Sequence, residues 1–392
     1  GRVIAEGTVD EVSHDPKSRI APFLANAGRG RDALAGTESS RDLSTHPAGA
    51  DSTPEVACEF DPFDLGRIHL ETSAIHTVKP LSVDIPRGRL VVVTGVSGSG
   101  KTTLVLESLI PALNAAAAGT PPPAHVRGVE AEGIRRAELI DSSPIGINVR
   151  STVATYAGVH DELRRAFART EDAKQAGYKA GDFSYNTGKL RCPTCDGTGQ
   201  ISLDVQFLPD VDIPCPSCRG SRYAAFASAI RRTSKDGSAL SLPQLMAMSV
   251  DEAIEATLGL KRVQTRLQTL SSLGLGYLTL GEATPALSGG EAQRLKLASE
   301  MGRAQDDTVF VFDEPTIGLH PLDVQTLLGV FDGLVSRGAT IVVIEHDLDV
   351  IHAADYVIDL GPGGGEHGGR IVATGTPKQI AENPESVTGR YL

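Results

Sequence analysis

Short apolar runs rich in Val, Ile and Leu recur along the chain, separated by segments with a polar face. A short stretch in which apolar and polar residues alternate, or a short continuous apolar run, predicts a β-strand. A longer segment with one polar face predicts a helix. The predicted strands are Arg67 to Leu70, Leu81 to Ile85, Leu90 to Val93, Thr308 to Phe312 and Thr340 to Ile344. The segment AQRLKLASEM, residues 292–301, is typical of a helix. Strands that alternate with helices indicate an α/β protein built on a parallel sheet.

The two ends of the chain carry near copies of one segment. GRVIAEGTVDEVSHDPKSRIAPFL, residues 1–24, aligns without a gap onto GRIVATGTPKQIAENPESVTGRYL, residues 369–392. We therefore expect residues 1–24 to be the tail of a preceding, similar unit and the chain to be one half of a tandem. Two unrelated segments of similar composition are the alternative.

Composition shifts divide the rest of the chain. Residues 25–56 are small, polar and aperiodic, which is typical of a flexible linker. A first part of the core is expected at 57–112, up to the tract NAAAAGTPPPA, which marks an exit from the core. An insertion at 113–285 and a second part of the core at 286–392 follow.

Bulk composition narrows the class of protein. The 392 residues are 40% hydrophobic, which is enough for a sizeable core. The net charge of −12 argues against a protein that binds nucleic acid over most of its surface, but it allows a local basic face. No apolar run is long enough to span a membrane, so no membrane partner is expected. Without a charged-then-apolar leader at Gly1, a cytoplasmic protein is expected.

The run LVVVTGVSGSGKTTL, residues 90–104, carries the strongest motif. Its glycines have the spacing of a phosphate-binding loop, whose backbone N–H groups form a concave nest at a helix N-terminus. Lys101 can reach the β- and γ-phosphates of a nucleotide, and the Thr102 hydroxyl can ligate Mg²⁺. The sequence therefore predicts a nucleotide site here.

Four of the five cysteines form two Cys-x-x-Cys pairs inside the insertion. They are Cys192, Cys195, Cys215 and Cys218. Two such knuckles close a tetrahedral Zn²⁺ site with no position left for water, so a structural zinc module is predicted at about 186–222. A redox role for one pair is the rival interpretation.

Further polar groups follow the predicted strands of the second core part. Ser288 and Gly289 of the LSGGE motif begin a predicted helix. The N-terminus of this helix is a second candidate anion-binding site, suited to a γ-phosphate. Asp313 and Glu314 end one strand, where one carboxylate can hold Mg²⁺ and the other can orient water. His346 follows another strand. Parallel strands present such groups together at their carboxyl edge.

Together these motifs resemble the ABC ATPases, and more specifically the UvrA family, the DNA-damage recognition ATPases of nucleotide excision repair. The matching stretches are Gly95 to Lys101, Cys192 to Cys218, Phe207 to Val211, Leu287 to Arg294, Asp313 to His320, Ile344 to Ile351 and Ile358 to Gly365. The resemblance covers residues 57–392 and the tail at 1–24. It implies an α/β ABC-type ATP-binding domain with a central mixed sheet, a helical signature subdomain and a zinc-binding insertion.

The resemblance also implies roles for single residues. Glu314 would be the catalytic carboxylate, with His346 beside it. ATP and Mg²⁺ would be bound by Gly95, Ser97, Gly98, Gly100, Lys101, Thr102, Thr103, Ser142 and Asp313. The ATP site of a facing cassette would be completed by Ser288, Gly289 and Gly290. Ser142 stands where the family usually has Gln, and Ile147 to Val153 replace an Arg-Thr-Pro-Arg-Ser-Asn-Pro run. The missing Gln puts the coupling between ATP and the neighbouring domain in question.

The expected partners are damaged duplex DNA, a second ABC cassette (from the same protein or a homodimer) and UvrB. Aromatic and basic residues interleave upstream of the first knuckle and can stack on bases and contact phosphates, although the aromatics can equally form a small core. The aromatics are Phe167, Tyr178, Phe183 and Tyr185, and the cations are Arg164, Arg165, Arg169, Lys174, Lys179, Lys189 and Arg191. A UvrA-like paralogue in antibiotic self-resistance, or in another non-repair role, is the alternative function. The ATPase subunit of a membrane transporter is a weaker third, because such subunits lack the zinc insertion.

Overall fold

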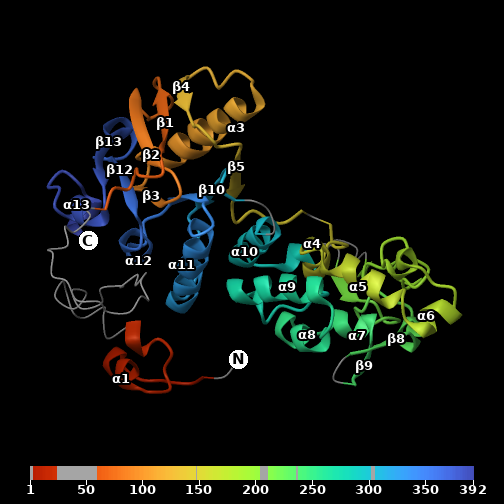
Figure 1. The fold of residues 1–392 in the computed structure, drawn as a ribbon. Helices are drawn as coiled ribbons and strands as arrows, with labels where there is room; N and C mark the ends of the chain where they lie inside the picture. Colours follow the sequence, from red (N-terminus) through yellow and green to blue (C-terminus); the bar gives the residue numbers. More distant parts are fainter. Residues whose placement is uncertain (1–2, 24–59, 147, 204–210, 235–236, 302–304) are drawn as a thin grey trace, which may run out of the picture. The chain divides into compact units, whose positions relative to one another are not determined.

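A computed structural model describes residues 3–23, 60–146, 148–203, 211–234, 237–301 and 305–392 (Figure 1). The predicted linker at 25–56, Cys58 and most of the stretch Phe207 to Val211 lie outside the described residues. The N-terminal residues form one compact unit, and nearly all residues from Pro62 onward form a second. No helix among the described residues has the length and apolar character needed to cross a membrane.

The second unit is built on a six-stranded mixed sheet in the order β13-β12-β3-β11-β10-β5. All neighbours are parallel except β12 and β13, which are antiparallel. The strands are β3 (Leu90–Gly95), β5 (Arg136–Ile140), β10 (Thr308–Asp313), β11 (Thr340–Ile344), β12 (Tyr356–Gly361) and β13 (Arg370–Gly375). The predicted mixed sheet is confirmed, and the strands expected from the apolar runs are present.

A three-stranded antiparallel sheet, in the order β2-β1-β4, accompanies the mixed sheet. Its strands are β1 (Arg67–Thr72), β2 (Leu81–Pro86) and β4 (Val126–Glu130). β4 and β5 fall within residues 113–285, which the sequence analysis assigned to the insertion, yet they pair with β1 and β10 of the core. The Ala- and Pro-rich tract is therefore a helix end and a turn within the core, and the chain leaves the core only after Ile140.

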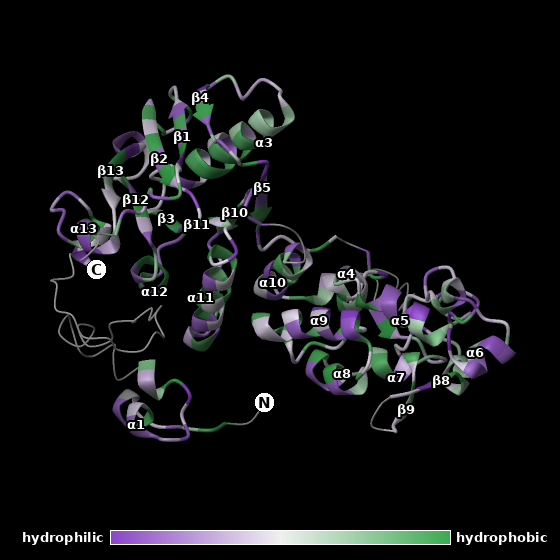
Figure 2. Ribbon diagram, viewed as in Figure 1, coloured by the Kyte–Doolittle hydropathy of each residue, from purple (hydrophilic) through white to green (hydrophobic). Residues whose placement is uncertain are grey.

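The central strands are apolar on both faces because helices cover both faces of a parallel sheet. On β3, Val91 and Val93 pack with Leu104 and Leu109, which follow the phosphate loop, whereas Val92 packs into the cluster that contains the helical insertion. In Figure 2, hydrophobic residues are visible on the strands of the sheet, whereas α6 in the insertion is largely hydrophilic. The sheet thus holds the strand ends rigidly in register.

Helices and short strand pairs make up the remainder. The core carries a helical segment at Thr103–Leu109 that continues into α3 (Ile110–Ala118), and also α10 (Gly289–Glu300), α11 (Pro321–Val335), α12 (Leu348–His352) and α13 (Pro377–Ala381). The insertion carries α4 (Val153–Tyr156), α5 (Val159–Phe167), α6 (Glu171–Gln175), α7 (Leu242–Met246), α8 (Val250–Ala256) and α9 (Lys261–Leu270), with the strand pairs β6 (Gln200–Leu203) and β7 (Val211–Pro214), and β8 (Arg231–Thr233) and β9 (Ala239–Ser241).

The N-terminal segment repeats the local geometry of the C-terminal one. Thr8 caps α1 (Val9–His14) in a capping box with Glu11, and Thr376 caps α13 in the same way with Gln379. Further along, Asp15 accepts a hydrogen bond from the backbone of Lys17 as Asn383 does from Glu385. The sequence repeat is therefore also a repeat of local structure.

Candidate functional site

The carboxyl ends of β3, β11 and β10 lie side by side, because the three strands are parallel neighbours in the sheet. The phosphate-type loop follows β3, and Glu345 and His346 follow β11. Asp313 ends β10, and Glu314 comes directly after it. The sheet thus brings together groups that are far apart in the sequence. Such an edge is where parallel α/β proteins place their ligands.

Glycine is required at several points of the loop after β3. A Cβ atom on Gly95 would lie 2.0 Å from the carbonyl oxygen of Leu360, and one on Gly100 would lie 2.6 Å from the side chain of Val78. Gly98 and Gly100 also have positive φ angles of 75° and 101°. The close approach leaves a backbone-lined concavity at the start of a helix, which fits the phosphates of a nucleotide.

Lys101 lies inside this loop. Its Nζ atom donates hydrogen bonds to the carbonyl oxygens of Gly95 and Val96, at 2.8 and 3.2 Å. Burial lowers the pKa of Lys101, while the charges of Glu314, Asp359 and Asp313 act in the opposite direction. The ammonium group is therefore held where an incoming phosphate would meet it.

Asp313 and Glu314 differ in their surroundings. Burial raises the pKa of Asp313, and the nearby carboxylates Glu314 and Asp141 raise it further. A bound cation would relieve the repulsion between these carboxylates. Because Mg²⁺ prefers oxygen ligands, this set of donor atoms fits Mg²⁺. Glu314 has a φ angle of +45°, a conformation that is costly for a residue with a side chain and that concentrates at functional sites.

A fully buried carboxylate, Glu345, joins the loops after β10 and β11. One of its oxygens accepts hydrogen bonds from the backbone N–H and the hydroxyl of Thr316, and the other accepts from the backbone N–H groups of His346 and Asp347, at 2.7 and 3.1 Å. Glu345 was not among the site residues predicted from the sequence. The sequence signal for it is an acidic residue directly after the apolar run Ile341 to Ile344. A charge buried at the end of such a run needs several hydrogen-bond donors.

A cleft of about 720 Å³ opens at this edge of the sheet. Its lining includes Gly95, Ser97, Gly98, Gly100, Lys101, Thr102, Thr103, Glu314 and His346. The imidazole of His346 is 65% exposed, and its Nδ1 atom lies 4.0 Å from a carboxylate oxygen of Glu314. Most of the predicted nucleotide-binding residues therefore surround one cavity, together with both predicted catalytic side chains.

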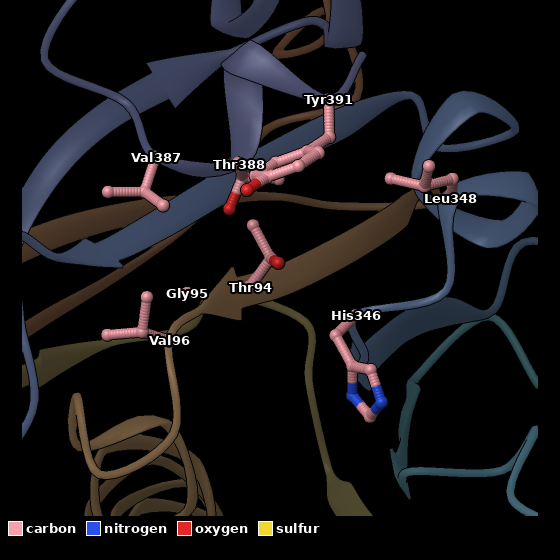
Figure 3. A pocket seen from close by; sticks show the side chains of 8 residues that line it. All are labelled: Thr94, Gly95, Val96, His346, Leu348, Val387, Thr388 and Tyr391. Carbon is pink, nitrogen blue, oxygen red and sulfur yellow. The ribbon is translucent and has the colours of Figure 1, made fainter.

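A smaller cavity of about 320 Å³ adjoins this cleft and shares Gly95, Val96 and His346 with it (Figure 3). Val387, Thr388 and Tyr391 of the C-terminal segment form its other wall. Thr388 also donates a hydrogen bond to Asp359 on β12, as does the buried Ser386. The segment that recurs at the N-terminus thus packs close to the nucleotide loop.

Of the other predicted nucleotide contacts, Asp313 ends β10, and four lie elsewhere, at the start of α10 and beside it. Ser288 caps this helix in a capping box with Glu291. A Cβ atom on Gly289 would lie 3.2 Å from that of Ser142, and one on Gly290 would lie 3.3 Å from Leu319. Ser142, Ser288, Gly289 and Gly290 therefore form a separate group outside the cleft lining.

The loop after β5 is tied to α10 by two long side chains. Lys296 donates to the carboxylate and backbone oxygen of Asp141 and to Ser143, and the buried Gln293 donates to the carbonyl of Ile140 at 2.7 Å. Burial acts to raise the pKa of Asp141, but the hydrogen bond from Lys296 holds that pKa below its usual range. A movement of α10 would thus be passed to the end of β5.

The four cysteines of the insertion converge. All four sulfurs lie within 4.8 Å of one another, with Sγ–Sγ distances of 3.9 Å between Cys192 and Cys215 and 3.7 Å between Cys195 and Cys218. Zn–S bonds of about 2.3 Å in a tetrahedron place sulfurs about 3.8 Å apart, so this donor set fits Zn²⁺. The hairpin β6–β7 joins the two knuckles.

Of the four aromatic side chains upstream of the knuckles, three are buried and one is partly buried. Phe167, Phe183 and Tyr185 are at most 1% exposed, and Tyr178 packs against the same core. The three buried rings cannot stack on bases in this fold, and all four rings pack into the core, as the alternative interpretation expected. Several of the interleaved cations are paired with carboxylates, among them Arg191 with Asp196 at 3.0 Å.

Comparison with known proteins gives consistent relatives. UvrABC system protein A from Lactiplantibacillus plantarum is 41% identical over 395 residues, which span 100% of this chain and 38% of that protein. The protein of the same name from Aquifex aeolicus is 41% identical, over 100% of this chain and 40% of its own length. The crystal structure of UvrA2 from Deinococcus radiodurans matches 99% of this chain and 43% of that one, with 38% identity and a TM-score of 0.81.

No family model matches the chain. The chain spans about two fifths of the length of the curated relatives it matches. Identity near 40% along the whole chain, an ABC-type mixed sheet with its phosphate loop, and a cluster of four cysteines agree in placing it. This chain belongs to the UvrA family.

Proposed function

We propose that the chain is an ATP-hydrolysing module of a UvrA-type DNA-damage recognition protein. The observation that carries this proposal is the single cleft that joins the phosphate loop, Glu314 and His346 in a chain about 40% identical to UvrABC system protein A along its whole length. The relatives favour this function over the non-repair alternative, because those named above carry the UvrA name.

In this proposal the loop after β3 and Lys101 bind the ATP phosphates, and Thr102 and Asp313 hold Mg²⁺. Bound Mg²⁺ supplies positive charge that neutralises the phosphates. Glu314 accepts a proton from the attacking water and orients it, and its strained backbone keeps the carboxylate at the cleft. His346 stands across from Glu314 and can donate a hydrogen bond toward the phosphates.

A second cassette completes the site in this proposal. Ser288, Gly289 and Gly290 lie at the start of α10 and outside the cleft of their own chain, so they are available to a facing cassette. The repeated segment at residues 1–24 is explained in the same way, as the closing segment of a neighbouring cassette. The domain limits given by the sequence stay part of this proposal, except that the core extends to Ile140.

The zinc module and the partners follow from the same assignment. Cys192, Cys195, Cys215 and Cys218 hold a structural Zn²⁺ that braces the insertion. We propose that the insertion contacts duplex DNA, that ATP turnover is coupled to this contact, and that the protein works with UvrB in the cytoplasm.

Duplex-stimulated ATP turnover tests the function. The purified chain is assayed with and without a duplex that carries one bulky lesion, and with an undamaged duplex as the matched control. We expect turnover to change when duplex is added, and more so with the lesion. The proposal is contradicted if neither duplex changes the rate of ATP turnover and no duplex binding can be measured.

A further inference from the structure

An exposed aromatic side chain, Tyr277, lies in the segment that connects α9 to α10, two helices that pack against each other (Figure 1). Tyr277 is 61% exposed, although the residues on either side of it, Gly276 and Leu278, are buried. A single exposed ring is ordinary on a protein surface, so its meaning depends on how the ring is held and on what lies beside it.

The backbone around Tyr277 is fixed by the start of α8. The N–H of Asp251 donates a hydrogen bond to the carbonyl of Gly276 at 3.0 Å. The N–H of Val250 donates to the carbonyl of Leu278 at 2.9 Å. A Cβ atom on Gly276 would lie 2.2 Å from a carboxylate oxygen of Asp251, so this close approach requires glycine. The turn therefore holds Tyr277 at a defined position on the surface.

The phenol of Tyr277 is tied to the start of α10 by one carboxylate. Its hydroxyl donates to an oxygen of Glu291 at 2.5 Å, and the other oxygen of Glu291 accepts from the backbone N–H of Ser288 at 2.7 Å. Burial acts to raise the pKa of Glu291, but the hydrogen bonds from Tyr277 and Ser288 hold that pKa below its usual range. Burial and the bond to Glu291 raise the pKa of Tyr277 to about 12, so the phenol keeps its proton at neutral pH.

This position places the ring beside the part of α10 that is proposed to meet the γ-phosphate of a facing cassette. Ser288 and Gly289 are exposed there, and Glu291 lies three residues further along. A nucleotide extends from its γ-phosphate through the sugar to the base, so its uncharged end needs a contact beyond the phosphate-binding residues. The charge of Glu291 disfavours a phosphate next to Tyr277, whereas an aromatic face can stack on any base.

We propose that Tyr277 is a nucleotide-contacting residue whose ring stacks on the base of the nucleotide held by a facing cassette. The inference rests on the proposed function and adds a side chain that acts on the base, whereas the phosphate loop and Ser288 act on the phosphates. Because the hydroxyl is occupied by Glu291, the faces of the ring are the surfaces that remain for the base. Stacking is stronger on the larger ring system of a purine, so the contact favours purine nucleotides.

The Tyr277→Ala variant tests this contact. KM and kcat are measured for ATP and for CTP, at a protein concentration where turnover per chain no longer rises. We expect the KM for ATP to rise by about 10-fold and the KM for CTP to rise less, with kcat within about threefold of the parent value. Tyr277→Phe keeps the ring and should restore the KM for ATP to within about threefold of the parent. Phe226→Ala, which removes a ring that is 53% exposed in the insertion, is the matched control and should behave like the parent.

Mixing variants shows which chain supplies the ring. In an equimolar mixture of Lys101→Ala and Ser288→Arg chains, the working site combines the phosphate loop of the Ser288→Arg chain with α10 of the Lys101→Ala chain. Adding Tyr277→Ala to the Lys101→Ala chain should therefore raise the KM of the mixture for ATP. Adding it to the Ser288→Arg chain should leave that KM at its starting value. A contact within one chain would give the opposite result and overturn the inference.

The remaining outcomes separate this contact from the proposed function. An unchanged KM for ATP in Tyr277→Ala, when the parent chain hydrolyses ATP, overturns the inference and leaves the proposed function standing. An equal rise in KM for ATP and CTP also overturns it, because the contact would then lie on the sugar or the phosphates. So does a higher protein concentration at half-maximal turnover with an unchanged KM, which assigns the ring to the protein surface of the facing cassette. If the parent chain shows no turnover at any concentration, the proposed function and this contact fail together.

Discussion

At the scale of single residues, the site depends on two carboxylates with different tasks. Glu314 lines the cleft in a strained conformation, whereas Glu345 is fully buried and accepts four hydrogen bonds from two loops. A charged acceptor with four donors is stable in the interior, because each donor to a charged group contributes about 1.5–3 kcal/mol. Glu345 is thus a positioning residue that holds the loops of Glu314 and His346 together.

The Glu345→Gln variant tests this positioning role. The amide keeps one acceptor oxygen, so one pair of donors loses its partner, and a buried donor without a partner costs about 1–3 kcal/mol. We expect kcat for ATP to fall by about 10-fold and the free energy of unfolding to fall by about 2 kcal/mol, with KM nearly unchanged. Glu345→Asp, which keeps both oxygens, should restore part of kcat. Loss of kcat and ATP affinity in equal measure would indicate general disorder of the cleft instead.

At the scale of elements, the apolar runs predicted the central strands β3, β10 and β11, because a strand covered on both faces is apolar at nearly every position. They did not predict β12, although it too is buried along its whole length. The same reasoning missed β5, whose Arg136 and Glu138 lie at the edge of the sheet and reach solvent. Interleaved aromatic and basic residues look alike in sequence whether they form a surface or a core. The burial of Phe167 and Tyr185 depends on packing with distant helices, which no local pattern reveals.

The candidate site was largely predictable for the same reason. Motifs such as the phosphate loop and the two cysteine pairs place their ligands by short-range spacing, so Lys101 and the four sulfurs are where the sequence expected them. The link from Lys296 to Asp141 spans 155 positions and joins two polar residues of ordinary type. Nothing in its local sequence distinguishes it, so only the fold exposes it.

Zinc content tests the knuckles as an element. Cys192→Ser removes one of four ligands from a site whose binding free energy also folds the knuckles, so we expect zinc per chain to fall well below one and the insertion to become protease-sensitive. Thr194→Ala, in the same knuckle, keeps every sulfur and should keep the metal. ATP affinity should be nearly unchanged in both variants. Full zinc content in Cys192→Ser by elemental analysis would contradict the four-sulfur site.

At the scale of the whole molecule, the cleft and the start of α10 are separate surfaces of one chain. If each completes the other only between two cassettes, turnover per chain should rise with protein concentration. Ser288→Arg and Lys101→Ala should each be inactive alone, because one blocks the facing surface and the other removes the phosphate-binding cation. An equimolar mixture should recover turnover, since mixed pairs contain one intact site. Turnover by a demonstrated monomer, independent of concentration, would refute the pairing.

ATP turnover by the Glu314→Gln variant is the decisive measurement. The amide has nearly the shape of the carboxylate but cannot accept the proton of the attacking water, so hydrolysis should slow by about 100-fold or more. The dissociation constant for ATP with Mg²⁺ should stay within about threefold of the parent value, because Lys101 and the loop glycines bind the phosphates. Glu138→Gln, which removes a partly exposed carboxylate from the edge strand β5, should behave like the parent. Turnover at the parent rate in Glu314→Gln would contradict the assignment of this cleft as the hydrolytic site.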